Sequence, residues 1–422
     1  MNLSAKRPDY KWVIIFVCFL LVFVCLGFCS GTKSLYLAPV TEALGISRSL
    51  YSLNDTTRHI TTAILNLFFG TLVYKLGIRK MIAGGILALI GSCLCYAFAR
   101  SVTVLCLGGF LLGVGVVCCS TTMVSSIIRR WFSTNIGRYT GIVLASNGLG
   151  SAVAAQLFTP IINREGTPFA YRDSYLLTVG ILVVVGILVL LLLKEKPADM
   201  AIPKDAPRKK ARGVQWHGIP LALAKKKLYF YLACGCILLT GMTLQGTSGI
   251  YAAYMKDVGI DAGVVANVVS TYAICLTLSK LVVGFLYDRF GLRWVMLVCQ
   301  SAAVACYIVM LLLGPSPAGI IFAFVFGVLL ALALPLETLV VPLITNDLFG
   351  ATSYEKILGI FMAMNYAGYA LGSPVANLSY DGFGSYKPML VCLAVLIFTI
   401  LVFFQFIINA AYKQKKAVMA QA

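Results

Sequence analysis

The sequence is poor in charged residues, and acids are the scarcest of them. Only 12% of its 422 residues are charged, with 15 Asp and Glu against 34 Lys and Arg, whereas soluble domains carry about 25% charged residues. Histidine occurs twice, at His59 and His217, and no two of the fourteen cysteines form a Cys-x-x-Cys pair. These shortages exclude an ordinary soluble domain and argue against a metal site.

Two further absences concern chemistry. No Walker motif occurs, which excludes ATP as the energy source. No nucleophile, base and acid form a set with a plausible site. We therefore expect a protein that is not an enzyme and that needs no cofactor.

Apolar residues, by contrast, make up 60% of the chain. Apolar runs of around 20 residues, each long enough to cross a hydrocarbon core of about 30 Å, recur along it. The twelve runs cover residues 12–37, 50–73, 81–99, 103–126, 139–162, 174–193, 228–254, 263–287, 294–313, 319–345, 357–378 and 388–411. They predict an all-α membrane protein with twelve transmembrane helices, the first of which is not a cleaved signal peptide.

The basic residues are distributed unevenly between the predicted loops. With the N-terminus inside, 25 of the 34 Lys and Arg lie on the cytoplasmic side, 6 outside and 3 within spans. This asymmetry follows the positive-inside rule and predicts that both termini are cytoplasmic. It also explains the net charge of +19 without a nucleic-acid partner.

A long polar stretch divides the chain into two halves that repeat each other. We predict an N-terminal six-helix half over residues 1–193, a cytoplasmic linker over 194–227 and a C-terminal six-helix half over 228–422. "GTLVYKLGIRK" (70–80) and "GFLYDRFGLRW" (284–294) share G-x-L-x-x-[KR]-[LF]-G-[IL]-R at an offset of 214 residues. Two parallel halves are typical of secondary transporters, which bind their substrate at the interface of the repeats.

These two loop copies resemble the loop motif of the major facilitator superfamily, G-x-x-x-D-[RK]-x-G-R-[RK]. The first copy has Tyr74 where the motif has its acid. The matching positions are Gly70, Lys75, Gly77 and Arg79 in the first copy and Gly284, Asp288, Arg289, Gly291 and Arg293 in the second. The resemblance implies that these residues gate transport. From the residues alone, tight turns with basic anchors explain them equally well.

Within that superfamily the chain resembles the branch of monocarboxylate transporters and oxalate/formate antiporters. The resembling stretches are "DYKWVIIFVCFL" (9–20), "TKSLYL" (32–37) and "RWFSTNIGRYTGIVLASNGLGSAV" (130–153). The resemblance implies a multi-pass protein of the cell membrane in which Lys33 helps to bind substrate. It also implies a substrate-binding cation at Lys280, where the branch has Arg. The acid that the branch carries four residues earlier is Leu276 here.

Lys33, Arg58 and Lys280 are the cations inside the predicted spans. Positions three or four apart share a helix face, and the face of Lys280 is small or polar, as at a helix interface or a water-filled cavity. Its members are Ala266, Ser270, Ala273, Thr277, Gly284 and Asp288. Lys280 therefore lines a cavity or extends to the cytoplasmic surface. Arg58 binds substrate or pairs with Asp55, and Lys33 binds substrate or reaches the outer surface.

Glu337 is an acid in the tenth span, on an otherwise apolar helix face. A buried carboxyl either pairs with a cation or takes up a proton. Because Leu276 replaces the acid of the branch, Glu337 is our candidate for proton coupling. The other polar residues of the spans line the cavity or pack the helices: Asn147, Gln245, Tyr251, Asn365 and Tyr366.

Together these features predict a monomeric secondary transporter of a small organic mono- or dicarboxylate anion. It would work by proton symport or by exchange with a counter-anion through alternating access, with Lys33, Arg58 and Lys280 binding the anion. Two alternatives remain. An exporter of larger amphipathic compounds would favour a weakly charged cavity, and a solute sensor that does not transport usually needs a soluble output domain.

Overall fold

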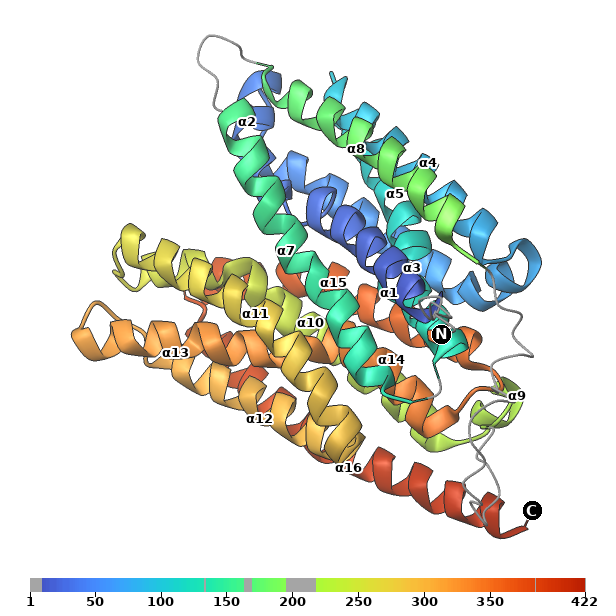
Figure 1. Cartoon of the computed structure of the whole chain (residues 1–422). Coiled ribbons are helices and arrows are strands. Elements are labelled where there is room, and N and C mark those ends of the chain that lie inside the picture. The colour runs from blue at the N-terminus through green and yellow to red at the C-terminus, as the bar shows by residue number, and fades with distance from the viewer. Residues whose placement is uncertain (1–9, 133, 163–168, 195–217, 384, 422) are drawn as a thin grey trace, which may run out of the picture. The chain divides into compact units, whose positions relative to one another are not determined.

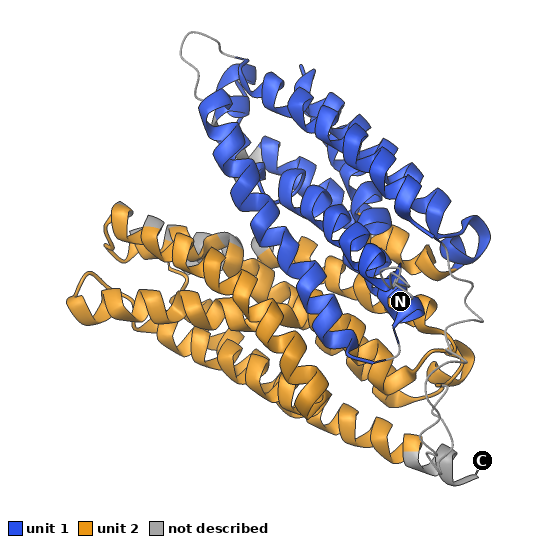
Figure 2. Cartoon of the chain, viewed as in Figure 1, with its two compact units in different colours: residues 1–61, 71–207 blue, residues 62–70, 208–422 orange. Residues whose placement is uncertain are grey.

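The computed structural model describes residues 10–132, 134–162, 169–194, 218–383 and 385–421 (Figure 1). Within these ranges the chain is helical, and the β-pairing is confined to an isolated bridge between Gly218 and Gly350. The chain divides into two compact units (Figure 2). The first comprises residues 1–61 and 71–207, and the second comprises residues 62–70 and 208–422. Most of the predicted linker, residues 195–217 with His217, lies outside the described residues.

The N-terminal helices come before the linker. They are α1 (Tyr10–Val22), η1 (Phe23–Phe28), α2 (Lys33–Leu44), α3 (Arg48–Leu76), α4 (Ile78–Ala97), α5 (Val102–Cys119), α6 (Thr121–Trp131), α7 (Ile136–Ile162) and α8 (Tyr171–Leu192). Serine caps start two of them, because the Ser47 hydroxyl accepts from the Leu50 N–H and the Ser101 hydroxyl accepts from the Val104 N–H.

The C-terminal helices follow the linker. They are α9 (Leu221–Ala224), α10 (Leu228–Asp257), α11 (Ala262–Phe290), α12 (Leu292–Leu311), α13 (Pro317–Ala333), η3 (Leu336–Val340), α14 (Val341–Ile344), η4 (Thr345–Phe349), α15 (Tyr354–Phe383) and α16 (Lys387–Gln421). Asp261 caps α11 through the Gly263 N–H, and Ser316 caps α13 through the Gly319 N–H.

The repeat read from the loop motif extends to whole helices. α3 and α11 each have 29 residues, α4 and α12 each have 20, and the second pair begins 214 positions after the first. One glycine separates the helices of each pair, with φ 77° and ψ 158° at Gly77 and φ 81° and ψ 177° at Gly291. Only glycine adopts this conformation readily. The glycine is therefore required by the turn itself, while Gly70 and Gly284 lie inside α3 and α11 rather than in a loop.

Ten helical segments in the described part of the chain are long and apolar enough to cross a membrane. The expected spans at 50–73 and 357–378 correspond to α3 and α15, which have 29 and 30 residues but are not among the ten. Both carry polar residues that are buried in the structure, Asn54 in α3 and Asn365 in α15. The count of twelve spans therefore stays a prediction.

Three expected spans are interrupted where the sequence reading took them as continuous. The first changes to the π-helix η1 and then to a turn before α2. The fourth breaks at Ser120, which has φ −121° and ψ −146°. In the tenth, η3, α14 and η4 follow α13, in a stretch where Pro335 and Pro342 lack an N–H for a regular helix. The irregular segments border Lys33 and contain Glu337.

The chain enters the second unit along an unusual route. After the linker, the Ile219 N–H donates to the Phe349 carbonyl at 3.0 Å, and the Leu221 N–H donates to the Ser353 hydroxyl at 3.1 Å. Ile219 and the first residue of α9 are thus bound to the last residue of η4 and to the turn that follows it.

Glycine allows close helix packing within each unit. A Cβ added to Gly150 of α7 would lie 2.3 Å from the Phe23 carbonyl oxygen of η1. A Cβ added to Gly368 of α15 would lie 2.1 Å from the Leu238 carbonyl oxygen of α10. Small residues at helix contacts drive packing in membranes, where lipid supplies no hydrophobic force between helices.

Gly368→Ala should therefore destabilise the protein by about 1–3 kcal/mol, since the methyl group meets backbone that cannot move aside. The matched control is Gly235→Ala on α10, where an added Cβ has no atom within 4 Å. That change should be neutral or slightly stabilising. The measurement is the thermal unfolding midpoint in detergent, and equal midpoints for the two variants would contradict the packing argument.

Candidate functional site

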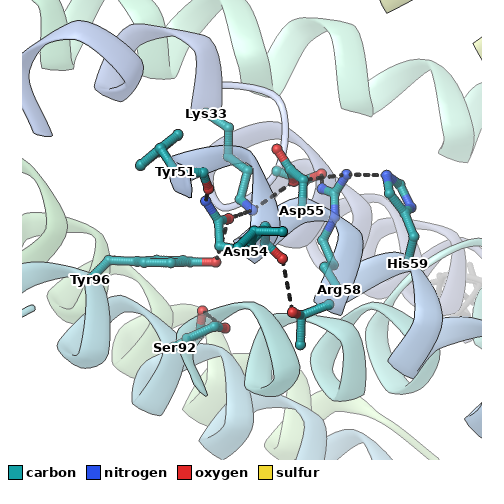
Figure 3. Close-up of polar contacts among 12 residues, drawn as sticks. Lys33, Tyr51, Asn54, Asp55, Arg58, His59, Ser92 and Tyr96 are labelled. Atoms are coloured by element: carbon teal, nitrogen blue, oxygen red, sulfur yellow. Dashed lines mark hydrogen bonds and ion pairs between the residues drawn. The ribbon is translucent and has the colours of Figure 1, made fainter. Parts of the chain in front are cut away.

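Two of the predicted cations meet at one carboxylate in the first unit. Lys33 begins α2, and Asp55 and Arg58 lie one turn apart on α3. The Lys33 Nζ atom is 2.7 Å from Asp55 Oδ1, and the Arg58 Nη2 atom is 3.3 Å from the same oxygen (Figure 3). We call Lys33, Asp55 and Arg58 the Asp55 triad. Arg58 thus pairs with Asp55 in this structure, which was one of its two predicted roles.

Neutral groups hold Lys33 in place. Its Nζ donates to Asn54 Oδ1 at 2.5 Å, and the Tyr96 hydroxyl of α4 donates to the same oxygen at 3.2 Å (Figure 3). The Asn54 amide in turn donates to the Tyr51 carbonyl. The Lys33 Nζ also lies 5.3 Å from the centre of the Tyr96 ring, within the range of a cation–π contact.

Arg58 has neutral partners of its own. Its Nη1 donates to the Ser30 hydroxyl at 2.5 Å, and its Nη2 lies 3.0 Å from His59 Nε2. The Arg58 guanidinium is therefore held by the Asp55 carboxylate and also by two neutral side chains, Ser30 and His59, which orient it without adding a negative charge.

The members of the triad differ in exposure. The side chains of Lys33 and Arg58 are 10% and 13% exposed, whereas that of Asp55 is 37% exposed. Lys33 is turned into the unit toward Asp55 instead of reaching a surface. The carboxylate is the most accessible group of the three.

Lys280 is buried in the second unit. It lies on α11 and is 3% exposed, which disagrees with a side chain that extends to the surface. The neighbouring Ser279 hydroxyl donates to the Ala331 carbonyl at 2.6 Å and so ties α11 to α13. This contact holds the helix segment that carries Lys280.

Glu337 is buried in η3, with 2% exposure. The polar neighbours of its carboxyl include Tyr369, Tyr272, Tyr307 and the backbone of Gln245. Its own backbone carbonyl accepts from Asn365 Nδ2 at 3.1 Å. Lys280 and Glu337, both described, form no ion pair with each other. The candidate for anion binding and the candidate for proton coupling in this unit therefore share no ionic contact.

The other candidates of the second unit mostly pack. The Tyr251 ring lies 5.7 Å from the rings of both Tyr272 and Phe326, and the Tyr366 ring lies 5.1 Å from that of Tyr369. Gln245 is half-buried on α10. These contacts match the helix-packing role that the sequence left open for them.

The remaining candidates lie in the first unit. Asn147 is half-buried on α7, and its carbonyl accepts from the Ser151 hydroxyl at 2.9 Å. Arg79, from the first loop copy, donates to the Leu190 carbonyl of α8 at 2.9 Å. Among the described residues, no three or more His, Cys, Asp or Glu side chains are arranged to hold a metal ion.

Sequence reasoning missed several groups around the triad. Tyr96, Ser30, His59 and Asn54 were not among the candidates. Asn54 could have been found, because it is an amide in an apolar span beside Asp55. Tyr96 carries no such signal, since nothing in the sequence tells which buried tyrosine faces a lysine 63 positions away.

The chain is similar to known proteins over most of its length. The profile of the family described as Major Facilitator Superfamily matches residues 15–243 and 231–420. Monocarboxylate transporter 12 of Rattus norvegicus is 24% identical over 429 residues, covering 94% of this chain and 85% of that protein. The uncharacterized MFS-type transporter YcxA of Bacillus subtilis (strain 168) is 24% identical over 293 residues, covering 69% of this chain and 68% of that protein.

The fold is also found among solved structures. The crystal structure of the transporter FucP in the outward conformation superposes with a TM-score of 0.73 at 16% identity. The match covers 94% of this chain and 99% of that chain. At this identity the likeness shows the fold alone.

The triad predicts strong energetic coupling between Lys33 and Asp55. Lys33→Gln and Asp55→Asn should each destabilise the protein, because the first removes one of the two cations of Asp55 and the second removes the carboxylate that Lys33 and Arg58 share. The double variant should lose less than the sum, with a coupling free energy of about 0.5–3 kcal/mol.

The measurement is a double-mutant cycle of unfolding in detergent. In the control cycle, Lys33→Gln is combined with Glu42→Gln instead of Asp55→Asn. Glu42 is an exposed acid on the same helix as Lys33. Its effect should add to that of Lys33→Gln. Equal additivity in both cycles would show that the short Lys33–Asp55 contact contributes nothing to stability.

Proposed function

Because the chain belongs to the Major Facilitator Superfamily, we propose that it carries a small organic mono- or dicarboxylate anion across the cell membrane by alternating access. The family match confirms the resemblance found in the two loop motifs. The chain is a multi-pass membrane transporter, related to monocarboxylate transporters at low identity. That relationship supports a carboxylate as the solute.

The observation that carries this proposal is the pair of largely buried cations that share one carboxylate in the first unit. Lys33 and Arg58 both contact Asp55, and Lys280 is buried in the second unit. A charged side chain inside a membrane is costly, roughly 2.5–3.5 kcal/mol at the centre of a helix on insertion scales. Two cations around one carboxylate create a local positive potential, which favours the binding of an anion.

The proposal includes a topology. α3 and α15 count as spans, which makes twelve, and both termini are cytoplasmic. Residues 1–193 and 228–422 are the two halves, and 194–227 form the linker. The loop residues around Gly77 and Gly291 gate the change between inward and outward access, and the protein acts as a monomer.

The energy source is a proton symported with the anion or a counter-anion exchanged for it. Glu337 is the acid that the sequence suggests for the proton. An exporter of amphipathic compounds is less well supported, because a cavity for such compounds does not need a cluster of buried cations.

A counterflow screen tests the function directly. Purified protein in proteoliposomes, preloaded with one unlabelled carboxylate at a time, should accumulate the same radiolabelled carboxylate for at least one member of a panel of mono- and dicarboxylates. Liposomes without protein are the control. No counterflow with any carboxylate, together with uptake of an amphipathic cation, would overturn the proposal.

Lys280→Gln should abolish counterflow while leaving a folded and inserted protein, because removing a buried charge lowers the cost of insertion. Lys280→Arg should retain activity, since it keeps the charge. Lys226→Gln, a change of an exposed lysine before α10, is the matched control and should transport at the wild-type rate. Wild-type counterflow by Lys280→Gln would remove Lys280 from the site.

A further inference from the structure

The Asp55 carboxylate already occupies the position that a substrate carboxylate needs beside Lys33 and Arg58. We propose that Asp55 is an internal counter-ion: the incoming anion replaces it on the two cations, and the released Asp55 takes up one proton. This inference rests on the proposed function and assigns proton coupling to a residue that the sequence reading treated only as a structural partner of Arg58.

The geometry separates a fixed part of the triad from a replaceable part. Lys33 is held by Asn54 Oδ1 at 2.5 Å, and Arg58 is held by the Ser30 hydroxyl at 2.5 Å. These contacts are independent of Asp55, so both cations keep their places when the carboxylate leaves. Asp55, with 37% of its side chain exposed, is the member that an anion meets first.

Competition between two carboxylates for the same two cations gives the stoichiometry. The empty site has two cations and one carboxylate. An anion that displaced Asp55 without a proton would leave two carboxylates close together, with Asp55 charged and away from its cations in a low-dielectric site. If Asp55 takes up a proton, the loaded site again has two cations and one carboxylate. One proton per anion therefore keeps the buried charge constant and makes transport of a monoanion electroneutral.

Other titratable groups face Asp55 and must be separated from it. They are Lys33 from α2, Tyr51, Arg58 and His59 from α3, and Tyr96 from α4. Of these, His59 is the side chain type that exchanges protons near neutral pH. It contacts Arg58 rather than lying between the two cations, so its removal should leave the exchange at Asp55 intact.

Glu337 lacks the arrangement that this mechanism needs. The groups that face its carboxyl include Tyr369, Tyr272, Tyr307 and the Gln245 backbone, and it forms no ion pair with Lys280. An anion that binds Lys280 therefore removes no cation from Glu337 and gives it no new reason to bind a proton.

The first experiment compares net uptake with exchange in proteoliposomes, using the carboxylate identified by counterflow. Asp55→Asn should lose uptake driven by an inward proton gradient. Without the Asp55 carboxylate, the substrate-free site would hold two cations and no carboxylate, and the empty protein would change slowly between inward and outward access. Anion exchange, in which the site stays loaded, should continue. Asp55→Glu should restore gradient-driven uptake. Whatever uptake His59→Gln and Glu337→Gln retain should still depend on the proton gradient, and Glu42→Gln, a change of an exposed acid on α2, is the control that should keep the wild-type rate.

The second readout is the pH dependence of the apparent KM for exchange. If one proton binds with each anion, the wild-type KM should rise by about tenfold per pH unit on the alkaline side, and Asp55→Asn should flatten this slope. A merely structural role of Asp55 would raise the KM at every pH and leave the slope unchanged. Two results would overturn the proposal. One is uptake by Asp55→Asn that is still driven by the proton gradient. The other is loss of this uptake in Glu337→Gln while the KM of Asp55→Asn keeps its wild-type dependence on pH.

A measurement on the unmodified protein guards against a variant that fails to fold. Purified wild-type protein in weakly buffered detergent solution should take up about one proton for each carboxylate bound, as read by a pH indicator. Carboxylate binding without proton uptake would overturn the role of Asp55 while leaving the proposed function standing. Absence of any carboxylate binding and counterflow would instead refute the proposed function.

Discussion

The cost of holding charge among apolar helices is the constraint on which the rest of this structure depends. The first unit meets that cost in two ways, with one carboxylate that neutralises part of the charge and with neutral groups that only orient it. The amide of Asn54 and the hydroxyl of Ser30 satisfy hydrogen-bond donors of Lys33 and Arg58 without cancelling a positive charge. The interior of the unit therefore stays both ordered and positive, and these two properties are what a binding site for anions requires.

Irregular backbone brings the charged residues to their places. The π-helix η1 ends the regular helix of the first span, and the turn that follows it leads directly to Lys33. Glu337 itself lies in η3, between Pro335 and Pro342. Such turns are weaker than regular helix, and they persist here because tightly packed neighbours support them, as Gly150 of α7 does for η1. Close glycine packing and irregular turns are therefore parts of one arrangement.

The sequence predicted much of the fold and part of the site, and the division has physical reasons. Hydropathy, the 214-residue repeat and the loop glycines depend on local rules, so the family and the turns at Gly77 and Gly291 could be read directly. Helical periodicity offered a buried Lys280 as one of two alternatives. The Lys33–Asp55 contact could not be found in this way, because it joins two helices and periodicity describes only one helix at a time.

The way in which the chain enters the second unit also has a structural consequence. Residues 219 and 221 are hydrogen-bonded to Phe349 and Ser353, so the chain is attached to the end of η4 and to the turn after it before it reaches α10. The place where the chain enters the second unit is therefore part of the hydrogen bonding of that unit itself, where the interrupted tenth span ends and α15 begins.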